Sequence, residues 1–342
     1  MTHLTYAEAM LVGLVQGVTE MFPVSSLGHN VLIPALIGGS WAQDLNVSRP
    51  ESPYLAFIVG LHVATAIAMV IYFRRDWIRI VGGFLSSVRD RRIATADQRL
   101  AWMIVLATIP VGIAGLALEH LFRVVFSKPV PTALFLAANG LILLAGERKR
   151  RRSALDARPA AAPAMAAQGG ASAPASSDAP LATGPGNDTA TAATRPANSD
   201  RTRQADQAVA ADLRLSVMGL GNAVLIGCAQ ILALLPGISR DGVVTVTGMA
   251  RGLPVADAVR YSFLLSAPVI LAAGVLKVPD LTGPLGNGIR GQVLAGSLLS
   301  GVGAYVSVSF LVRYFARSRS LAPFGVYCLV AGLGSAAYLL LR

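Results

Sequence analysis

The sequence predicts an all-α polytopic membrane protein. Hydrophobic residues make up 54% of its 342 residues, charged residues make up 14%, and the mean hydropathy is +0.59. Six windows contain no Asp, Glu, Lys or Arg, and most are long enough to cross about 30 Å of hydrocarbon at about 1.5 Å per residue. These windows predict spans at about 53–73, 100–118, 129–146, 260–277, 291–312 and 320–341. The arginines gather at the ends of the windows, as the positive-inside rule requires, so the net charge of +11 needs no nucleic acid to explain it.

The first element is a hairpin over residues 9–43. The stretch Ala9–Gln43 is long enough for two short helices, but Glu20 and His29 lie at mid-depth and Pro23 breaks the helix between them. We therefore expect a re-entrant hairpin that enters and leaves the membrane on one face.

Three spans follow this hairpin, and two basic segments orient them. Arginines cluster between residues 74 and 92, and the run Arg148–Arg152 follows the third span. If both segments face the cytoplasm, the first hairpin enters from the opposite side. This arrangement defines a first membrane repeat over residues 1–152.

A polar linker over residues 153–211 separates the two membrane halves. It consists mainly of Ala, Pro, Ser, Thr, Gly and Asp, which cannot form a packed core. We expect a disordered cytoplasmic tether that spans roughly 40 Å on average. A role as a docking segment is the weaker interpretation.

The second repeat, residues 212–342, begins with a segment that has two interpretations. If Leu215–Ser239 crosses the membrane, five arginines lie outside: Arg251, Arg260, Arg313, Arg317 and Arg319. If residues 215–250 form a re-entrant hairpin, these five lie inside and only Lys277 and Arg290 lie outside, which obeys the charge rule. The second interpretation gives an inverted-topology repeat of one hairpin and three spans, with six spans in all. A shift of 214 positions supports it. This shift places Gly13, Gln16, Ser25 and Gly28 on Gly227, Gln230, Ser239 and Gly242.

The two hairpins carry the side chains that suggest chemistry. A carboxylate, an imidazole and a guanidinium at membrane depth are costly to desolvate, so each should be paired or line a wet cavity. A helix can start within each of the motifs Pro-x-Ser-Ser-x-Gly and Pro-Gly-x-Ser-Arg. The free backbone N–H groups at a helix start and the serine hydroxyls favour a bound anion. The arginine of the second motif adds a planar guanidinium that can donate two parallel hydrogen bonds to phosphate. The candidate catalytic residues are Glu20, Ser26, His29 and Arg240. The candidate substrate-binding residues are Gln16, Ser25, Gly28, Gly237, Ser239, Asp241 and Gly242.

These groups suit the hydrolysis of a phosphoanhydride on a lipid. Arg240 would hold phosphate, His29 would carry a proton, and either Ser26 or an activated water would attack phosphorus. Glu20 could attack instead, or could hold a divalent cation, Mg or Ca, because Mg²⁺ often uses one or two carboxylates plus substrate oxygens. A simpler alternative is that Glu20 and Arg240 form a buried ion pair that holds the hairpins together. His62 is expected to be an ordinary interior histidine outside the site.

At these motifs the sequence resembles the undecaprenyl-diphosphatase family, the bacitracin-resistance membrane phosphatases that recycle the polyprenyl carrier of cell-wall and peptidoglycan synthesis. The family pattern of Glu or Gln, three residues, Glu, and Phe-Leu-Pro-x-Ser-Ser-x-Gly-His matches Gln16 to His29, with Met21-Phe22 in place of Phe-Leu. The resemblance covers roughly residues 5–146 and 213–341. It implies hydrolysis of undecaprenyl diphosphate to undecaprenyl phosphate and phosphate. It also implies a multi-pass place in the bacterial inner membrane, with a site that opens to the extracytoplasmic side.

The second motif departs from the family's Pro-Gly-x-Ser-Arg-Ser-Gly-x-Thr. Asp241 stands where Ser is usual and Val244 where Thr is usual. We expect Asp241 to be ionised and paired with Arg240, or to supply a second metal ligand. An alternative function for the whole architecture is a polyprenyl-phosphate transporter or flippase, because opposed hairpins also suit alternating access. The expected partners are the polyprenyl diphosphate substrate, membrane lipid and, as a homodimer, a second copy of the chain.

Overall fold

The computed structural model describes residues 4–45, 53–121, 128–156, 210–283, 288–317 and 319–341, and over these ranges it is helical with no strand. Five helices are long and apolar enough to cross a membrane, and two bent helix pairs raise the number to as many as seven. The predicted class, an all-α polytopic membrane protein, is therefore confirmed. The predicted number of six spans lies within this range and stays a prediction.

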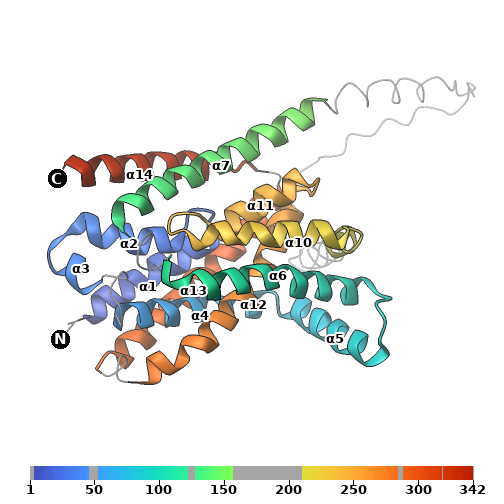
Figure 1. The fold of residues 1–342 in the computed structure, drawn as a ribbon, viewed down its shortest axis with the longest axis horizontal. Coiled ribbons are helices and arrows are strands. Elements are labelled where there is room, and N and C mark those ends of the chain that lie inside the picture. The colour runs from blue at the N-terminus through green and yellow to red at the C-terminus, as the bar shows by residue number, and fades with distance from the viewer. Residues whose placement is uncertain are drawn as a thin grey trace, which may run out of the picture.

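The first half has seven helices in its described part (Figure 1). They are α1 Tyr6–Met21, α2 Ser26–Ile37, α3 Gly39–Asp44, α4 Pro53–Tyr72, α5 Arg74–Asp90, α6 Ala96–Leu121 and α7 Pro129–Asp156. Thr5 caps the start of α1 in a capping box with Glu8. The chain leaves the helix after Met21 and re-enters it at Ser26, as Pro23 predicted. The first predicted hairpin thus corresponds to α1 and α2.

The second half repeats a broken pair followed by three long helices. After a short helix Ala210–Ser216 come α10 Leu220–Cys228, the 3₁₀ segment η2 Ala229–Leu234, α11 Arg240–Ala250, α12 Val255–Thr282, α13 Arg290–Ala316 and α14 Ala322–Leu341. The short helix meets the following segment at 98°. The first arm of the hairpin predicted at 215–250 begins at Leu220. Gly219 and Gly221 allow the sharp bend between the short helix and this arm.

Each hairpin packs on the other half of the molecule. Helix α1 lies along α13, and α10 lies along α6. A Cβ at Gly13 would lie 2.2 Å from the Gly296 carbonyl oxygen, and a Cβ at Gly227 would lie 2.3 Å from that of Ala107. Gly13 and Gly227 are partners under the 214-residue shift, so the two hairpins make corresponding contacts.

Helix α5 occupies a segment that the sequence suggested only as a basic loop. It leaves α4 at an angle of 87°. Ile78 and Leu85 are 73% and 61% exposed on it, while its arginines form ion pairs or face outward. A search for charge-free windows does not detect this helix, because arginines interrupt its apolar residues. This pattern is typical of a helix that lies in the membrane interface.

An ionic cluster joins α5 to the start of the second half. Arg79 contacts Asp76 at 2.8 Å and also pairs with Asp212, which accepts from Arg260 at 3.0 Å. Asp212 directly follows the predicted linker, most of which lies outside the described residues. Helix α7 continues to Asp156, and the next described helix begins at Ala210. Both halves of the molecule are therefore helical close to the linker.

Candidate functional site

Glu20 is the centre of the candidate site. Its side chain is only 5% exposed and lies near the end of α1. The Oε2 atom accepts from Gln16 Nε2 at 3.0 Å and from the Ser26 hydroxyl, and it lies 3.3 Å from His62 Nε2. The Oε1 atom accepts from Arg240 Nη2 at 2.5 Å. The carboxylate is thus surrounded by donors from α1, α2, α4 and α11.

Gln16 extends this network to α2. It lies one helical turn before Glu20, so both side chains point to the same face of α1. Its Oε1 accepts from Asn30 Nδ2 at 2.5 Å, and both residues are buried. The two arms of the first hairpin are therefore joined by an unbroken chain of hydrogen bonds.

Ser25 brings the two hairpins together. Its φ of 68° lies in the left-handed region, which non-glycine residues seldom adopt. In this conformation its hydroxyl oxygen accepts from the backbone N–H groups of Gly28 and Gly237, each at 3.2 Å. A Cβ at Gly28 would lie 3.0 Å from the Gly237 Cα, so the close approach depends on glycine there. Gly237 itself has a φ of 110°, which favours glycine for a second reason.

The second hairpin has the same cap. Ser239 accepts from the Gly242 N–H at 3.2 Å, as Ser25 does from Gly28. Asn139 of α7 fixes both turns, because its Oδ1 accepts from the Ser239 N–H and its Nδ2 donates to the Pro23 carbonyl, each at 3.0 Å. Sequence reasoning missed Asn139. A buried amide in an otherwise apolar span was the available signal.

Arg240 and Glu20 form an ion pair across 220 positions of sequence. The Arg240 side chain is 16% exposed, so the pair is largely shielded from water. This is the geometry of the simpler alternative, an ion pair that holds the hairpins together. The ion pair also brings Arg240, the expected phosphate clamp, close to the Ser26 hydroxyl. The same geometry is therefore compatible with a structural ion pair and with a phosphate-binding site.

Asp241 does not pair with Arg240, so that expectation was wrong. Its Oδ1 accepts from the hydroxyls of Ser262 and Ser266 on α12, at 2.6 and 2.7 Å. Consecutive side chains at a helix start point in different directions. Arg240 therefore reaches α1 while Asp241 faces α12.

His29, the expected proton carrier, has partners other than Glu20. Its Nδ1 donates to the Ser25 carbonyl oxygen at 2.7 Å, and its Nε2 forms a hydrogen bond with the Tyr327 hydroxyl at 2.7 Å. The two rings are also stacked, with centroids 5.8 Å apart. The structure thus joins Glu20, Ser26 and Arg240 in one cluster and places His29 in a separate pair.

His62 lies in the cluster, although the sequence analysis left it out. Its Nδ1 is 2.8 Å from the Ile58 carbonyl oxygen, and its Nε2 faces Glu20. Only a ring that is protonated on both nitrogens can donate to both groups. The stretch Gly60-Leu61-His62 also resembles the family, but neither hairpin motif contains His62, and α4 brings it to the site from a separate span.

Divalent cations prefer oxygen ligands, and the site offers few. Glu20 and Ser26 supply a carboxylate and a hydroxyl, the types that Mg²⁺ or Ca²⁺ uses. Among the described residues no group of three or more His, Cys, Asp or Glu could hold a metal ion. The residues therefore fit a cation only if a substrate provides further oxygens and Arg240 leaves Glu20.

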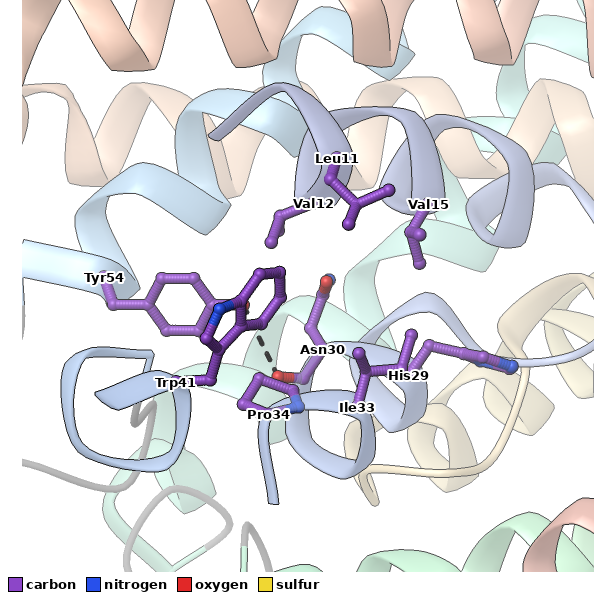
Figure 2. Close-up of a pocket in the computed structure, with 9 residues that line it drawn as sticks. All are labelled: Leu11, Val12, Val15, His29, Asn30, Ile33, Pro34, Trp41 and Tyr54. Carbon is purple, nitrogen blue, oxygen red and sulfur yellow. Dashed lines mark hydrogen bonds between the residues drawn. The ribbon is translucent and has the colours of Figure 1, made fainter. Parts of the chain in front are cut away.

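A small, mostly apolar pocket lies between α1 and α2, next to this network (Figure 2). Leu11, Val12 and Val15 of α1 face Ile33 and Pro34 of α2 across it. Trp41, Tyr54, His29 and Asn30 complete the lining. Asn30 is the same residue that donates to Gln16, so the apolar pocket and the polar cluster share a wall.

Comparison with known proteins agrees with these motifs. The family model for the bacitracin resistance protein BacA matches residues 9–177 and 197–334. The chain is 55% identical to the undecaprenyl-diphosphatase of Mycolicibacterium paratuberculosis over 99% of both chains. It is 52% identical to undecaprenyl-diphosphatase 1 of Frankia casuarinae over 97% of both chains. It is 37% identical to undecaprenyl-diphosphatase 2 of Chromobacterium violaceum, over 95% of this chain and 96% of that protein. The chain therefore belongs to the bacitracin resistance protein BacA family.

Proposed function

We propose that this chain is an integral membrane phosphatase that hydrolyses undecaprenyl diphosphate to undecaprenyl phosphate and inorganic phosphate. Relatives at 52% and 55% identity, aligned over nearly the whole chain, carry the name undecaprenyl-diphosphatase. One observation carries the proposal further: a buried carboxylate, Glu20, contacts both a hydroxyl and a guanidinium between membrane helices. Hydrolysis of a lipid diphosphate can use these groups as base, nucleophile and phosphate clamp.

Arg240 is the phosphate-binding group in this proposal. Its guanidinium can offer two parallel N–H groups to phosphate oxygens. In the free protein it contacts Glu20, which keeps the charge paired until substrate arrives. The backbone N–H groups at the starts of α2 and α11 add dipoles that favour an anion at the same place.

Ser26 is the nucleophile that the contacts favour. Its hydroxyl already donates to Glu20, which can take its proton as Oγ attacks the terminal phosphorus. The bond from phosphorus to the bridging oxygen breaks, and undecaprenyl phosphate leaves with that oxygen. Water then hydrolyses the phosphoserine, which releases phosphate and returns the proton to Ser26. Direct attack by a water held by Glu20 is the alternative.

His62 orients and stabilises Glu20 in this scheme. A doubly protonated ring beside the carboxylate keeps it ionised and ready to accept a proton. His29 has a different place, because Tyr327 holds its Nε2. A proton-carrying role for His29 stays a prediction that requires this hydrogen bond to open.

A divalent cation, Mg or Ca, is part of the proposal. Glu20 and Ser26 would hold it together with substrate oxygens, and it would neutralise charge on the diphosphate. Because Arg240 occupies Glu20 in the free protein, the cation should bind only with substrate. Isothermal titration with Mg²⁺, with and without an inert diphosphate analogue, tests this order of binding.

The substrate tail has a suitable surface beside the site. The pocket between α1 and α2 is lined mainly by apolar side chains, and Leu11 on its wall is 49% exposed, so the wall continues onto the outer face of α1. In this proposal the isoprenoid tail lies against the apolar outer face of α1 beside this pocket, while its headgroup stays near Glu20. We place the protein in the bacterial inner membrane with the site open to the extracytoplasmic side, on the basis of the arginine distribution.

Phosphate release by the purified protein in liposomes that contain undecaprenyl diphosphate tests the function. We expect release by the wild type and less than about a hundredth of that rate from Ser26→Ala if Ser26 is the nucleophile. Residual release well above that level in Ser26→Ala would favour water. Movement of lipid phosphate between leaflets with no release at all would instead support the transporter.

A further inference from the structure

Helix α5 carries an apolar stripe that the described parts of the chain leave exposed. The stripe consists of Ile78, Val81, Leu85 and Val88, which are 73%, 49%, 61% and 52% exposed. Successive members are three or four residues apart, so all four lie on one face of the helix. An exposed apolar face of this length marks an interaction surface.

The opposite face of α5 is fixed to α6, beside which it lies (Figure 1). Ile80, Gly83 and Ser87 are buried on this face. A Cβ at Gly83 would lie 2.8 Å from the backbone carbonyl carbon of Asp97, and Trp102 Nε1 donates to the Ser87 hydroxyl at 2.9 Å. These contacts hold the helix in one orientation, with the apolar stripe turned away from the protein.

Arginines stand at both ends of the exposed face. Arg74 lies four residues before Ile78, and Arg75 lies three residues before it. Arg89 lies four residues after Leu85. At these spacings the arginines share the face of the stripe, and all three are exposed. The face is therefore apolar along its middle and positive at each end.

The two carboxylates of α5 leave this positive charge available. Asp76 is only 13% exposed and contacts Arg79 at 2.8 Å. Asp90 contacts Arg89 at 3.2 Å, but the Arg89 side chain is 84% exposed, and water weakens a surface pair of this kind. The two arginines at the start of the helix form no ion pair with any residue that the structure describes. An anionic partner can therefore bind without displacing a strong internal contact.

The direction of α5 places this face at a membrane surface. Helix α4 is the span predicted at 53–73, and α5 leaves it at 87°, so α5 runs close to the membrane plane. An amphipathic helix in this position buries its apolar face at the boundary between headgroups and acyl chains. Arg74 and Arg89 are about 23 Å apart along the axis at about 1.5 Å per residue, so the two ends contact different lipids.

We propose that α5 binds the anionic phospholipids of the leaflet in which it lies. The apolar stripe enters the acyl region, while Arg74, Arg75 and Arg89 donate hydrogen bonds to headgroup phosphates. Zwitterionic lipids also carry a phosphate, but only anionic lipids give the membrane surface the negative potential that attracts arginines. Anionic lipid is therefore enriched around α5. This contact goes beyond the proposed function and does not depend on phosphate release.

Quenching of a fluorescent probe on α5 by spin-labelled lipids tests the inference. A bimane group is attached at Leu85→Cys in the full-length protein, with Cys228 and Cys328 replaced by Ala. The protein is placed in phosphatidylcholine liposomes that contain an equal small fraction of either nitroxide-labelled phosphatidylglycerol or nitroxide-labelled phosphatidylcholine. We expect at least about twofold stronger quenching by the anionic lipid. Salt at about 1 M should remove the difference, because it screens charges beyond about 3 Å.

A probe at Leu298→Cys is the control for position. Leu298 on α13 is 69% exposed, and no basic residue lies within two helical turns of it along this helix. Both lipids should quench this probe equally, because an apolar position without arginines has no preference for headgroup charge.

Two triple variants control for net charge. The first replaces Arg74, Arg75 and Arg89 with Gln and should abolish the preference at position 85. The second replaces three exposed basic residues near the end of α7 with Gln: Arg148, Lys149 and Arg152. It loses the same charge and should keep the preference.

Equal quenching by the two lipids at position 85, or an equal preference at position 298, would overturn the inference. A preference that survives in the first triple variant, or that is lost equally in the second, would also overturn it. Absence of quenching by either lipid would show that protein, such as a second copy of the chain, covers the stripe. Phosphate release is measured separately: release without the lipid preference refutes only the α5 contact, and the preference without release refutes only the phosphatase.

Discussion

Glu20 and Arg240 are costly residues to bury. Each carries a charge between membrane helices, and the contact at 2.5 Å compensates for lost water only while both partners are present. Most buried ion pairs stabilise little in comparison with apolar residues, but removal of one partner leaves an uncompensated charge. The pair therefore gives a test that separates structure from catalysis.

We predict that Arg240→Ala lowers the free energy of unfolding by about 1–3 kcal/mol, because Glu20 loses its guanidinium donor and keeps only His62 as a charged partner. The double variant Glu20→Gln and Arg240→Ala should recover most of this loss, although neither form should release phosphate. Thermal unfolding in detergent, followed by intrinsic fluorescence, measures both. A double variant that is no more stable than Arg240→Ala would show that the pair is not the source of the cost.

The sequence motifs account for only part of the residues in the site. Gln16, Glu20, Ser26 and Arg240 could be predicted because Pro, Gly and Ser around them mark broken helices at membrane depth. His62 and Asn139 could not, because each lies in an otherwise apolar span and reaches the site only through helix packing. The partners of a side chain were also beyond the sequence: His29 and Asp241 lie in the motifs, but they bond to Tyr327 and Ser262.

We predict that His62→Ala lowers kcat for phosphate release by about a hundredfold, because Glu20 loses a charged donor that keeps it ionised. His62→Gln keeps a neutral donor and should recover part of the rate. Steady-state kinetics with undecaprenyl diphosphate measure both variants. Full activity in His62→Ala would make His62 the interior histidine that the sequence first suggested.

Helices approach one another most closely where glycine faces backbone. A Cβ at Gly17 would lie 2.2 Å from the Ser300 carbonyl oxygen on α13. Backbone atoms cannot yield as a flexible side chain can, so any side chain here must push α1 away from α13. Because Gly17 lies between Gln16 and Glu20 in sequence, this packing fixes the position of both functional side chains.

We predict that Gly17→Val destabilises the protein by about 1–3 kcal/mol and also reduces activity, because it displaces α1. Gly112→Ala is the control, since an added Cβ there meets no atom within 4 Å and alanine favours a helix. The control should unfold at the same temperature as the wild type or slightly above it. If Gly17→Val unfolds like Gly112→Ala, the close contact between α1 and α13 is not required.

The elements were predictable from the sequence to different degrees. Long helices at all six charge-free windows and the break at Pro23 follow from composition and from proline chemistry. Helix α5 and the 3₁₀ end of the second hairpin's entering arm do not, because an amphipathic helix breaks the charge-free pattern and a 3₁₀ segment has no distinct sequence signature.

Both membrane halves of the chain contribute residues to one site. Helices α7 and α14, from opposite halves, run side by side along one edge (Figure 1). The ionic cluster of Arg79, Asp212 and Arg260 adds a second connection next to the linker. The linker itself is therefore not needed to hold the halves together.

We predict that replacing residues 160–205 with a Gly/Ser segment of about 20 residues preserves membrane insertion and activity, because contacts on both sides of the linker position the halves. Expression level and phosphate release measure the result. Asp212→Ala in the same background is the informative comparison, since it removes the ionic anchor and should lower stability. Loss of expression with the flexible replacement alone would assign the linker a structural or partner-binding role.

The distance along the chain between Glu20 and Arg240 has a consequence for biosynthesis. Ribosomes add roughly 5–20 residues per second, so Arg240 is made roughly 10–40 s after Glu20. During that interval the first half has no guanidinium from α11 for its carboxylate. We therefore expect the nascent first hairpin to stay in contact with water, shallower than its final depth, and to sink into place only when the second hairpin arrives. A ribosome-bound fragment that ends before residue 240 should then leave a cysteine introduced at the buried position Val24, with Glu20 intact, open to a water-soluble thiol reagent, whereas the complete protein should protect it.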